Sequence, residues 1–266
     1  MKKVEERISI TLENCNQKIF GILHLPENIK NPPIVLFCHG LAGNKSGKFR
    51  VYVDLAYRLA LKGIATFRFD YRGCGDSEGM FYDVTPSAHY SDSLLCLEYL
   101  KTYPGIDSTR IGIFGRSFGG PVAIKTASSF QEEIKSIALW CPMFDGEQWS
   151  DQWKLITKNE VSEEKKIKMM SVDGQQVSHS FFEEFFKINV NEDLSKIKKI
   201  PLLHIQGEKD TRVNNSHALH YEDCRKSGEA KSKFIKLTNS DHDFSDSTER
   251  EKALLETENW FVETLL

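Results

Sequence analysis

The chain has 266 residues, 40% of them hydrophobic, and its 35 lysines and arginines against 38 aspartates and glutamates give a formal charge of −3. This length is ample for one domain with a large buried core. The charge is nearly balanced and no basic patch is interleaved with aromatics, which argues against a nucleic-acid partner. No apolar run approaches the length of a membrane span, and Glu5, Glu6 and Arg7 interrupt any apolar signal-peptide core. We expect a cytoplasmic protein without a membrane partner, and the six cysteines agree because they form no C-x-x-C pair or scaffold spacing.

Strand-like and helix-like segments alternate along most of the chain. Segments 8–12 and 18–25 predict an antiparallel pair that opens a sheet. Further strands are expected at 34–38, 64–70, 110–114, 136–141, 201–207 and 233–237, and helices at 51–62, 88–103, 216–225 and 249–265. Such alternation predicts an α/β protein with a mostly parallel central sheet and helices on both faces, here over residues 1–266 as a single domain.

The pentapeptide Gly115-Arg116-Ser117-Phe118-Gly119 joins the strand at 110–114 to a helical segment. A G-x-S-x-G motif between a strand and a helix is typical of a nucleophile elbow. The sharp turn strains the backbone of Ser117, the flanking glycines make room for it, and the hydroxyl is exposed above the sheet. The alternative is an ordinary glycine-rich turn with a solvated serine, since short motifs also match by chance.

A serine nucleophile needs a base to take its proton and an acid to orient that base. Asp210 follows the strand at 201–207, and His242 follows the strand at 233–237. The chain order Ser117, Asp210, His242 is the order found in α/β-hydrolases. Glu208, two residues from Asp210, and Asp145, in the loop after strand 136–141, are alternatives for the acid.

Two backbone N–H groups are expected to form an oxyanion hole. One belongs to Phe118, directly after the nucleophile. The other belongs to Leu41, because strand 34–38 runs into His39-Gly40-Leu41 and the glycine lets the backbone approach a substrate closely. The alternative for His39-Gly40 is a plain turn at the end of a strand.

The segment Asp70-Tyr71-Arg72-Gly73-Cys74-Gly75-Asp76-Ser77 resembles the D-x-R-G-x-G-x-S turn of the α/β-hydrolase family. Together with His39-Gly40, the elbow, Asp210 and His242, the resemblance covers nearly the whole chain. Within the family, the ending at 242–246 and the insertion before residue 201 look most like those of bacterial cinnamoyl and feruloyl esterases. The resemblance implies the α/β-hydrolase fold and carboxylic-ester hydrolysis with Ser117, Asp210 and His242 as the triad.

The chain departs from those esterases on both sides of the nucleophile. Arg116 stands where they usually carry histidine, and Phe118 where glutamine is common. We expect Arg116 to point away from the pocket and Phe118 to influence substrate preference beside the oxyanion hole.

The alternation breaks between residues 143 and 199, which predicts a cap (lid) insertion above Ser117. A hairpin turn is expected at 172–175, followed by phenylalanines at helical spacing. Trp149, Trp153, Phe181 and Phe185 are the expected substrate contacts, and they favour an apolar or aromatic acyl group. The alternative is that these aromatics only seal the insertion onto the main domain.

These observations predict a serine carboxylesterase that acts on a small-molecule ester through an acyl-enzyme. A thioesterase, an acyltransferase and a small-peptide hydrolase are alternatives because all share the elbow, and a non-catalytic binding module is the least favoured. No cofactor or metal is expected, since His217 and His220 have a metal-like spacing but no third ligand. The sequence leaves the oligomeric state open and allows a homodimer.

Overall fold

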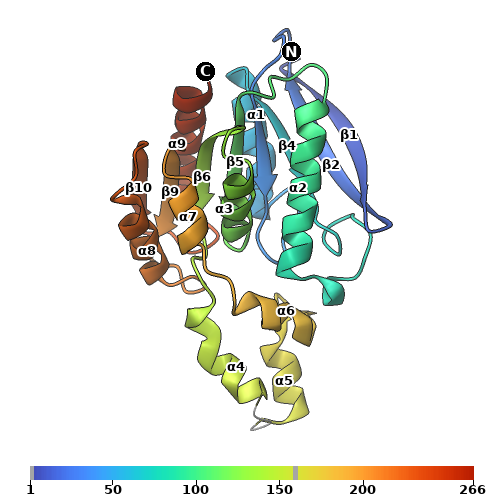
Figure 1. Ribbon diagram of the computed structural model, residues 1–266, viewed down its shortest axis with the longest axis vertical. Helices are drawn as coiled ribbons and strands as arrows, with labels where there is room; N and C mark the ends of the chain where they lie inside the picture. Colours follow the sequence, from blue (N-terminus) through green and yellow to red (C-terminus); the bar gives the residue numbers. More distant parts are fainter. Residues whose placement is uncertain (1–2, 158–160) are drawn as a thin grey trace.

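A computed structural model describes residues 3–157 and 161–266. The main strands are β1 (Glu5–Asn14), β2 (Gln17–Pro26), β3 (Ile34–Cys38), β4 (Ala65–Phe69), β5 (Ile111–Arg116), β6 (Ile134–Trp140), β9 (Leu202–Gly207) and β10 (Ser232–Leu237). They form one sheet in the order β1-β2-β4-β3-β5-β6-β9-β10 (Figure 1). The pairs β1–β2 and β2–β4 are antiparallel, and every other neighbouring pair is parallel. The predicted mostly parallel sheet is therefore confirmed.

The burial of each strand follows from its composition. Every residue of β3, β4, β5 and β9 is buried, as expected for parallel strands covered on both faces. The edge strand β1 instead alternates exposed and half-buried residues, because one of its faces meets solvent. The central strands therefore form the core beneath the loops that carry the predicted site.

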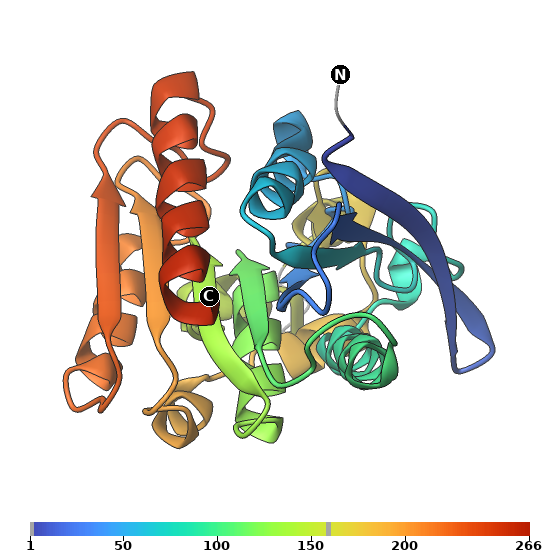
Figure 2. The ribbon, with the colours of Figure 1, turned by 90° about the horizontal axis from the view of Figure 1, so that it is seen from above.

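Helices cover the two faces of the sheet in separate groups. On one face lie α1 (Val51–Leu61) and α9 (Ser247–Leu265), and on the other α2 (Pro86–Thr102), α3 (Gly119–Ser129) and α8 (Asn215–Arg225) (Figure 2). Two of these helices begin at a capping side chain: Thr85 caps α2 before a proline in its first turn, and Asp246 caps α9. Each group packs its buried side onto one of two hydrophobic clusters that the sheet separates. The prediction of helices on both faces is confirmed.

The segment 143–199 contains several short elements. They are η3 (Glu147–Trp149), α4 (Ser150–Thr157), α5 (Glu163–Met169), β7 (Ser171–Val172), β8 (Gln175–Gln176), α6 (His179–Phe185) and α7 (Asn191–Lys196). Helices α4, α5 and α6 extend beyond one end of the sheet, at the bottom of Figure 1, whereas α7 packs back against α3 and α8. The expected hairpin is present as β7–β8, with Asp173 and Gly174 at its turn in left-handed conformations of φ 49° and 80°.

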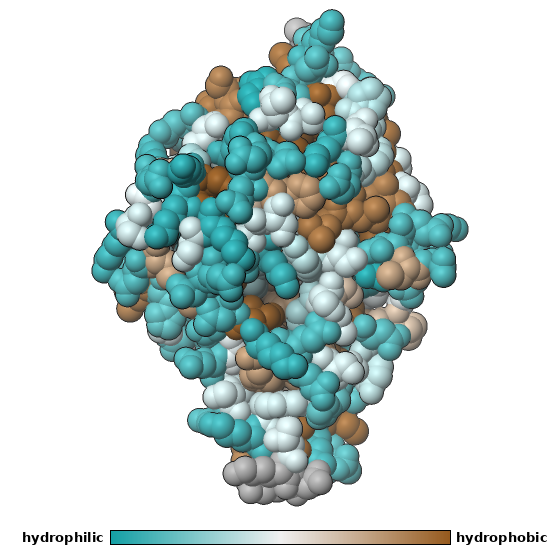
Figure 3. Space-filling model, in the orientation of Figure 1, coloured by the Kyte–Doolittle hydropathy of each residue, from teal (hydrophilic) through white to brown (hydrophobic). Residues whose placement is uncertain are grey.

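Hydrophilic side chains cover most of the face shown in Figure 3, and apolar ones show through in smaller areas. None of the helices described in residues 3–157 and 161–266 combines the length and the hydrophobicity that crossing a bilayer requires.

Candidate active site

Ser117 occupies the turn between β5 and α3 in the strained conformation expected of an elbow. Its φ is 54°, in the left-handed region that non-glycine residues seldom adopt. A Cβ at position 115 would lie 2.6 Å from the carbonyl oxygen of Gly119, and a Cβ at position 119 would lie 2.1 Å from that of Cys38. Both glycines are therefore sterically required, because the turn presses α3 against the end of β3.

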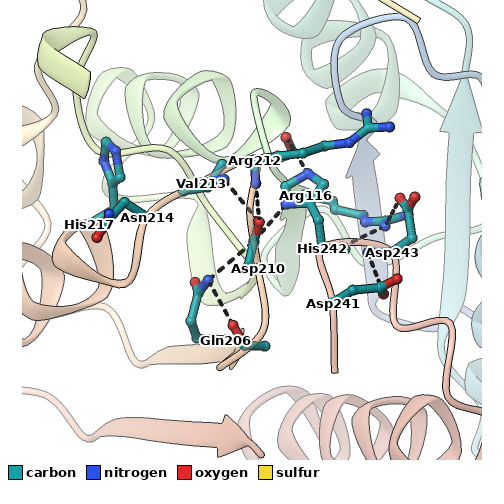
Figure 4. Close-up of polar contacts among 12 residues, drawn as sticks. Arg116, Gln206, Asp210, Arg212, Val213, Asn214, His217, Asp241, His242 and Asp243 are labelled. Atoms are coloured by element: carbon teal, nitrogen blue, oxygen red, sulfur yellow. Dashed lines mark hydrogen bonds and ion pairs between the residues drawn. The ribbon is translucent and has the colours of Figure 1, made fainter. Parts of the chain in front are cut away.

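Ser117, His242 and Asp210 form a continuous chain of hydrogen bonds. His242 Nε2 lies 2.9 Å from Ser117 Oγ. Its Nδ1 lies 2.7 Å from Asp210 Oδ2, and Figure 4 shows His242 beside Asp210. The other carboxylate oxygen, Asp210 Oδ1, accepts from the backbone N–H groups of Arg212 at 2.8 Å and Val213 at 2.9 Å. These bonds leave Oδ2 directed at the imidazole, so the acid can hold the ring in the tautomer with a proton on Nδ1.

The two alternative acids lie elsewhere. Glu208 is exposed on the same loop, and the Asp145 carboxylate accepts from the N–H of Glu147 at 3.0 Å and lies 3.9 Å from His220. In the part of the chain that the structure describes, neither carboxylate bonds to His242. The structure thus brings Asp210 to the histidine.

The loop after β3 lies directly on the elbow. A Cβ at Gly40 would sit 3.2 Å from Ser117 Cβ, so only a glycine allows this approach without displacement of the neighbour. His39 Nδ1 donates to the Gly40 carbonyl at 2.8 Å, and its Nε2 accepts from the N–H of Tyr71 at 3.3 Å. Burial lowers the pKa of His39, which keeps the ring neutral and fits this donor and acceptor pattern. His39 therefore orients the peptide that links Gly40 to Leu41.

The two predicted oxyanion donors both line the pocket. The N–H groups of Leu41 and Phe118 have no acceptor among residues 3–157 and 161–266. Ala42, one residue after Leu41, adopts a left-handed φ of 54°. The loop thus holds a strained turn beside the nucleophile, with two backbone donors unpaired at the pocket.

Asp70 stabilises the loop after β3, and the sequence alone did not predict this role. The carboxylate is fully buried; its Oδ1 accepts from the backbone N–H of Lys45, and its Oδ2 accepts from the ammonium of Lys45 and the N–H of Asp76. Burial alone would lower the pKa of Lys45, but Asp70 and Asp76 outweigh it and the pKa is raised. The turn that resembles D-x-R-G-x-G-x-S thereby anchors the loop that carries Leu41.

A cavity of about 700 Å³ opens above Ser117. The four residues expected to contact substrate, Trp149, Trp153, Phe181 and Phe185, all line it. Phe118 joins them, with its ring centroid 5.8 Å from that of Phe181 and 6.1 Å from that of Phe185. The aromatic wall is therefore shared between the elbow and segment 143–199. The lining also includes carboxylates paired with cations, Asp243 with Lys48 and Arg116, and Asp173 with Arg212.

The expectation that Arg116 points away from the pocket is wrong. Arg116 lines the cavity, is only 6% exposed, and donates from Nη2 to the carbonyl of His242 and to Asp243 Oδ1, both at 2.8 Å (Figure 4). A buried guanidinium needs acceptors. The loop after β10 supplies two to Nη2, whereas Nε has no hydrogen-bond partner in the described chain.

One group of metal-ligating residue types lies close together in the described chain: Cys141, Asp210 and His242. Asp210 and His242 already bond to each other, and burial followed by the charge of Asp210 raises the pKa of the Cys141 thiol well above its usual value. A protonated thiol is a poor metal ligand, so these residues fit a proton-transfer site better than a metal site.

Comparison with known proteins agrees with this geometry. Residues 30–180 match the hydrolase family described as serine aminopeptidase, S33, a range that includes the Gly40 loop and the elbow but ends before Asp210. The chain is 31% identical over 121 residues to Esterase FrsA of Photorhabdus laumondii (45% of this chain, 28% of that protein). It is 32% identical over 130 residues to Thiohydrolase aneE of Aspergillus aculeatus (48% of this chain, 39% of that protein). Matches to other curated relatives span about half of their length.

The fold also matches solved structures. The ferulic acid complex of Est1E from Butyrivibrio proteoclasticus superposes with a TM-score of 0.79 at 20% identity, covering 96% of this chain and 98% of that one. The mostly parallel sheet and the position of the elbow between β5 and α3 are those of an α/β-hydrolase. By its fold and its sequence match, the chain belongs to the serine aminopeptidase S33 family of hydrolases.

Proposed function

We propose that this protein is a serine hydrolase that cleaves carboxylic esters through an acyl-enzyme on Ser117. The observation that carries the proposal is the unbroken chain of hydrogen bonds from Ser117 through His242 to Asp210 at the base of the cavity. Activation of a serine by a base that is itself oriented by an acid is the arrangement that nucleophilic acyl transfer needs.

In the first half-reaction, Ser117 Oγ attacks the ester carbonyl while His242 Nε2 takes the hydroxyl proton. The N–H groups of Leu41 and Phe118 then stabilise the negative charge on the carbonyl oxygen, and such donors each contribute about 3–4 kcal/mol to lowering a barrier. The imidazolium passes its proton to the leaving alcohol oxygen as the carbon–oxygen bond breaks. The acyl group is left on Ser117.

In the second half-reaction, water replaces the alcohol. His242 takes a proton from the water, the resulting hydroxide attacks the acyl carbonyl, and the proton returns to Ser117 Oγ as the acid leaves. Asp210 stabilises the imidazolium in both halves and holds its Nδ1–H.

We further propose that segment 143–199 is a cap that selects an apolar or aromatic acyl group of small to medium size. Its aromatic side chains form much of the lining above Ser117, and the solved structure of Est1E, which has the same fold, holds ferulic acid. Flat aromatic walls of this kind favour ligands of matching shape and polarity.

A thioester and an amino-terminal peptide bond are the two alternative substrates, because one relative is named a thiohydrolase and the family is described as an aminopeptidase. An unpaired carboxylate in the pocket would be a suitable partner for the ammonium of an amino-terminal peptide. Asp173 and Asp243, the pocket carboxylates outside the triad in the described chain, are both paired with cations. This pairing favours an ester or thioester over an amino-terminal peptide.

The test is turnover of p-nitrophenyl esters from acetate to laurate by the wild type, with Ser117→Ala as the inactive variant. Ser129→Ala is the matched control, since Ser129 lies on α3 and bonds to Tyr90 and Lys125 outside the cavity lining. We expect turnover in the wild type and Ser129→Ala, no turnover in Ser117→Ala, and an optimum at short or medium acyl chains.

Parallel assays with an acyl thioester and an aminoacyl p-nitroanilide compare the three bonds. A higher kcat/KM for the thioester or the anilide would replace the ester proposal. Activity retained in folded Ser117→Ala would refute the role of Ser117.

A further inference from the structure

Arg116 links the nucleophile elbow to the loop that carries the base. It is the last residue of β5 and is bonded covalently to Ser117, while its guanidinium reaches residues 126 and 127 positions further along the chain. One nitrogen, Nη2, serves both the backbone carbonyl of His242 and the carboxylate of Asp243. The nucleophile and the base are thus joined by a second connection, separate from the bond between Ser117 Oγ and His242 Nε2.

Asp243, directly after His242, is the second residue that the Arg116 guanidinium binds. Its carboxylate is held by Arg116 and, from the loop that precedes α1, by Lys48. Burial alone would raise the pKa of Asp243, but the bond from Lys48 and the charge of Arg116 outweigh it and the pKa is lowered. A charged Asp243 therefore ties together the loop after β3, the elbow and the loop after β10.

The loop around His242 needs such support because its backbone is strained. Phe244, two residues after His242, adopts a left-handed φ of 54°, which is costly for a bulky side chain. Hydrogen bonds from the N–H groups of Asp243 and Ser245 to Asp241 Oδ1 hold the turn from within. Arg116, next to the nucleophile, stabilises the same turn by donating to the carbonyl of His242.

We propose that Arg116 is a positioning residue that holds the backbone of His242 so that Nε2 stays within hydrogen-bond distance of Ser117 Oγ. The proposal rests on the proposed function, since it assigns Arg116 a role in the same acyl transfer. A misplacement of a catalytic group by about 1 Å can cost on the order of 100-fold in rate. Arg116 therefore acts on kcat through His242 without contacting the reacting atoms.

The test compares Arg116→Met, which removes the donors, with Arg116→Lys, which keeps the charge and one donor group. Arg225→Met is the matched control, because Arg225 is also buried and bonds the carbonyls of Ile197 and Ile200, but lies outside the cavity lining. kcat and KM are measured with the best p-nitrophenyl ester at a temperature where circular dichroism shows each variant folded. We expect Arg116→Met to lose about 10- to 100-fold in kcat with KM within about two-fold, Arg116→Lys to recover part of it, and Arg225→Met to keep the wild-type kcat.

Equal losses of kcat in Arg116→Met and Arg225→Met would show that Arg116 only stabilises the fold and would overturn the proposal. If Arg116→Met does not fold, Asp243→Asn provides the second variant. It weakens the hold on the loop while leaving the bond from Arg116 to the His242 carbonyl, so a smaller fall in kcat is expected, and an unchanged kcat would count against the proposal.

Covalent labelling of Ser117 by a fluorophosphonate separates this proposal from the proposed function. Labelling needs a serine activated by His242, but no ester turnover. If the wild type is labelled and hydrolyses none of the esters, the ester proposal fails while the labelling rate still measures positioning. Arg116→Met labelled as fast as the wild type would then overturn the role of Arg116, and a wild type that is not labelled at all would overturn both.

Discussion

The hydrogen bonds of Asp210 orient its carboxylate toward the imidazole of His242. Its Oδ1 is saturated by two backbone N–H groups, so its Oδ2 faces His242 in a fixed direction. An asparagine at this position could keep the two backbone bonds with its oxygen, but it would then present its NH2 group, a donor, to the imidazole. The tautomer and the imidazolium would then lose their support.

We expect Asp210→Asn to lower kcat by about 10³- to 10⁴-fold while leaving the midpoint of urea unfolding nearly unchanged. Glu208→Gln and Asp145→Asn are the matched controls, since these residues are the alternative acids and neither bonds to His242 in the described chain. Steady-state measurement of kcat for the three variants shows which carboxylate is the acid of the triad. A larger loss in either control than in Asp210→Asn would move the acid to that residue.

Among the elements, α6 contributes Phe181, Phe182 and Phe185 to the cavity wall. Phe185 is 7% exposed, and its ring centroid lies 5.4 Å from that of Phe181, 5.2 Å from Trp149 and 6.1 Å from Phe118. The side chain thus packs within segment 143–199 and also lines the pocket. Packing within this segment and lining the cavity are not exclusive, and contact of these aromatic side chains with a substrate stays a prediction.

We expect Phe185→Ala to destabilise the protein by about 3 kcal/mol or more and to shift the optimum of p-nitrophenyl esters toward longer acyl chains. Phe130→Ala is the comparison, since Phe130 ends α3 outside the cavity lining and packs on the same large cluster. Urea unfolding and the chain-length profile are the measurements. A profile that does not change in folded Phe185→Ala would remove this residue from the substrate contacts.

At the scale of the whole molecule, buried histidines make stability depend on pH. Burial lowers the pKa of His89 to about 3 and that of His204 to about 4. His89 Nε2 and His204 Nδ1 have no hydrogen-bond partner in the described chain, which fits nitrogens that carry no proton. Both histidines are therefore neutral in the folded protein at pH values where an unfolded histidine, with a pKa near 6.5, takes up a proton.

The sign follows from proton linkage. Below about pH 6.5 the unfolded chain binds more protons than the folded one, so acid favours unfolding until the pH reaches the folded pKa values. We expect the free energy of unfolding to fall as the pH drops from 6.5 to 5, with a slope that approaches about 1.4 kcal/mol per pH unit for each histidine toward pH 5. Urea unfolding at pH 7, 6 and 5 measures it, and His204→Phe, which meets the rings of Tyr221 and Phe234, should reduce the slope. A slope equal in the wild type and this variant would contradict the prediction.

Much of the architecture could be predicted because its signals are local. The continuous apolar runs of β3 and β9, the proline and threonine at the start of α2, and the glycines around Ser117 each report on a few neighbouring residues. The sequence also predicts that Ser117, Asp210 and His242 lie close together, because loops that follow parallel strands meet at one edge of the sheet. The boundaries were less accurate: β4 is shorter than the predicted strand at 64–70, and β5 extends to Arg116.

The amino-acid sequence is enough to predict the fold class, the elbow and the chain order of the three residues that the hydrogen bonds connect. Three features need the folded chain: the choice among the candidate carboxylates for His242, the partners of the Arg116 guanidinium, and the bonds by which Asp70 holds the loop that carries Leu41. The reason is physical. A turn or a buried strand depends on its own residues, whereas the partner of a buried charge depends on which distant loops the packed sheet places beside it, as Arg116 and His242 show from 126 positions apart.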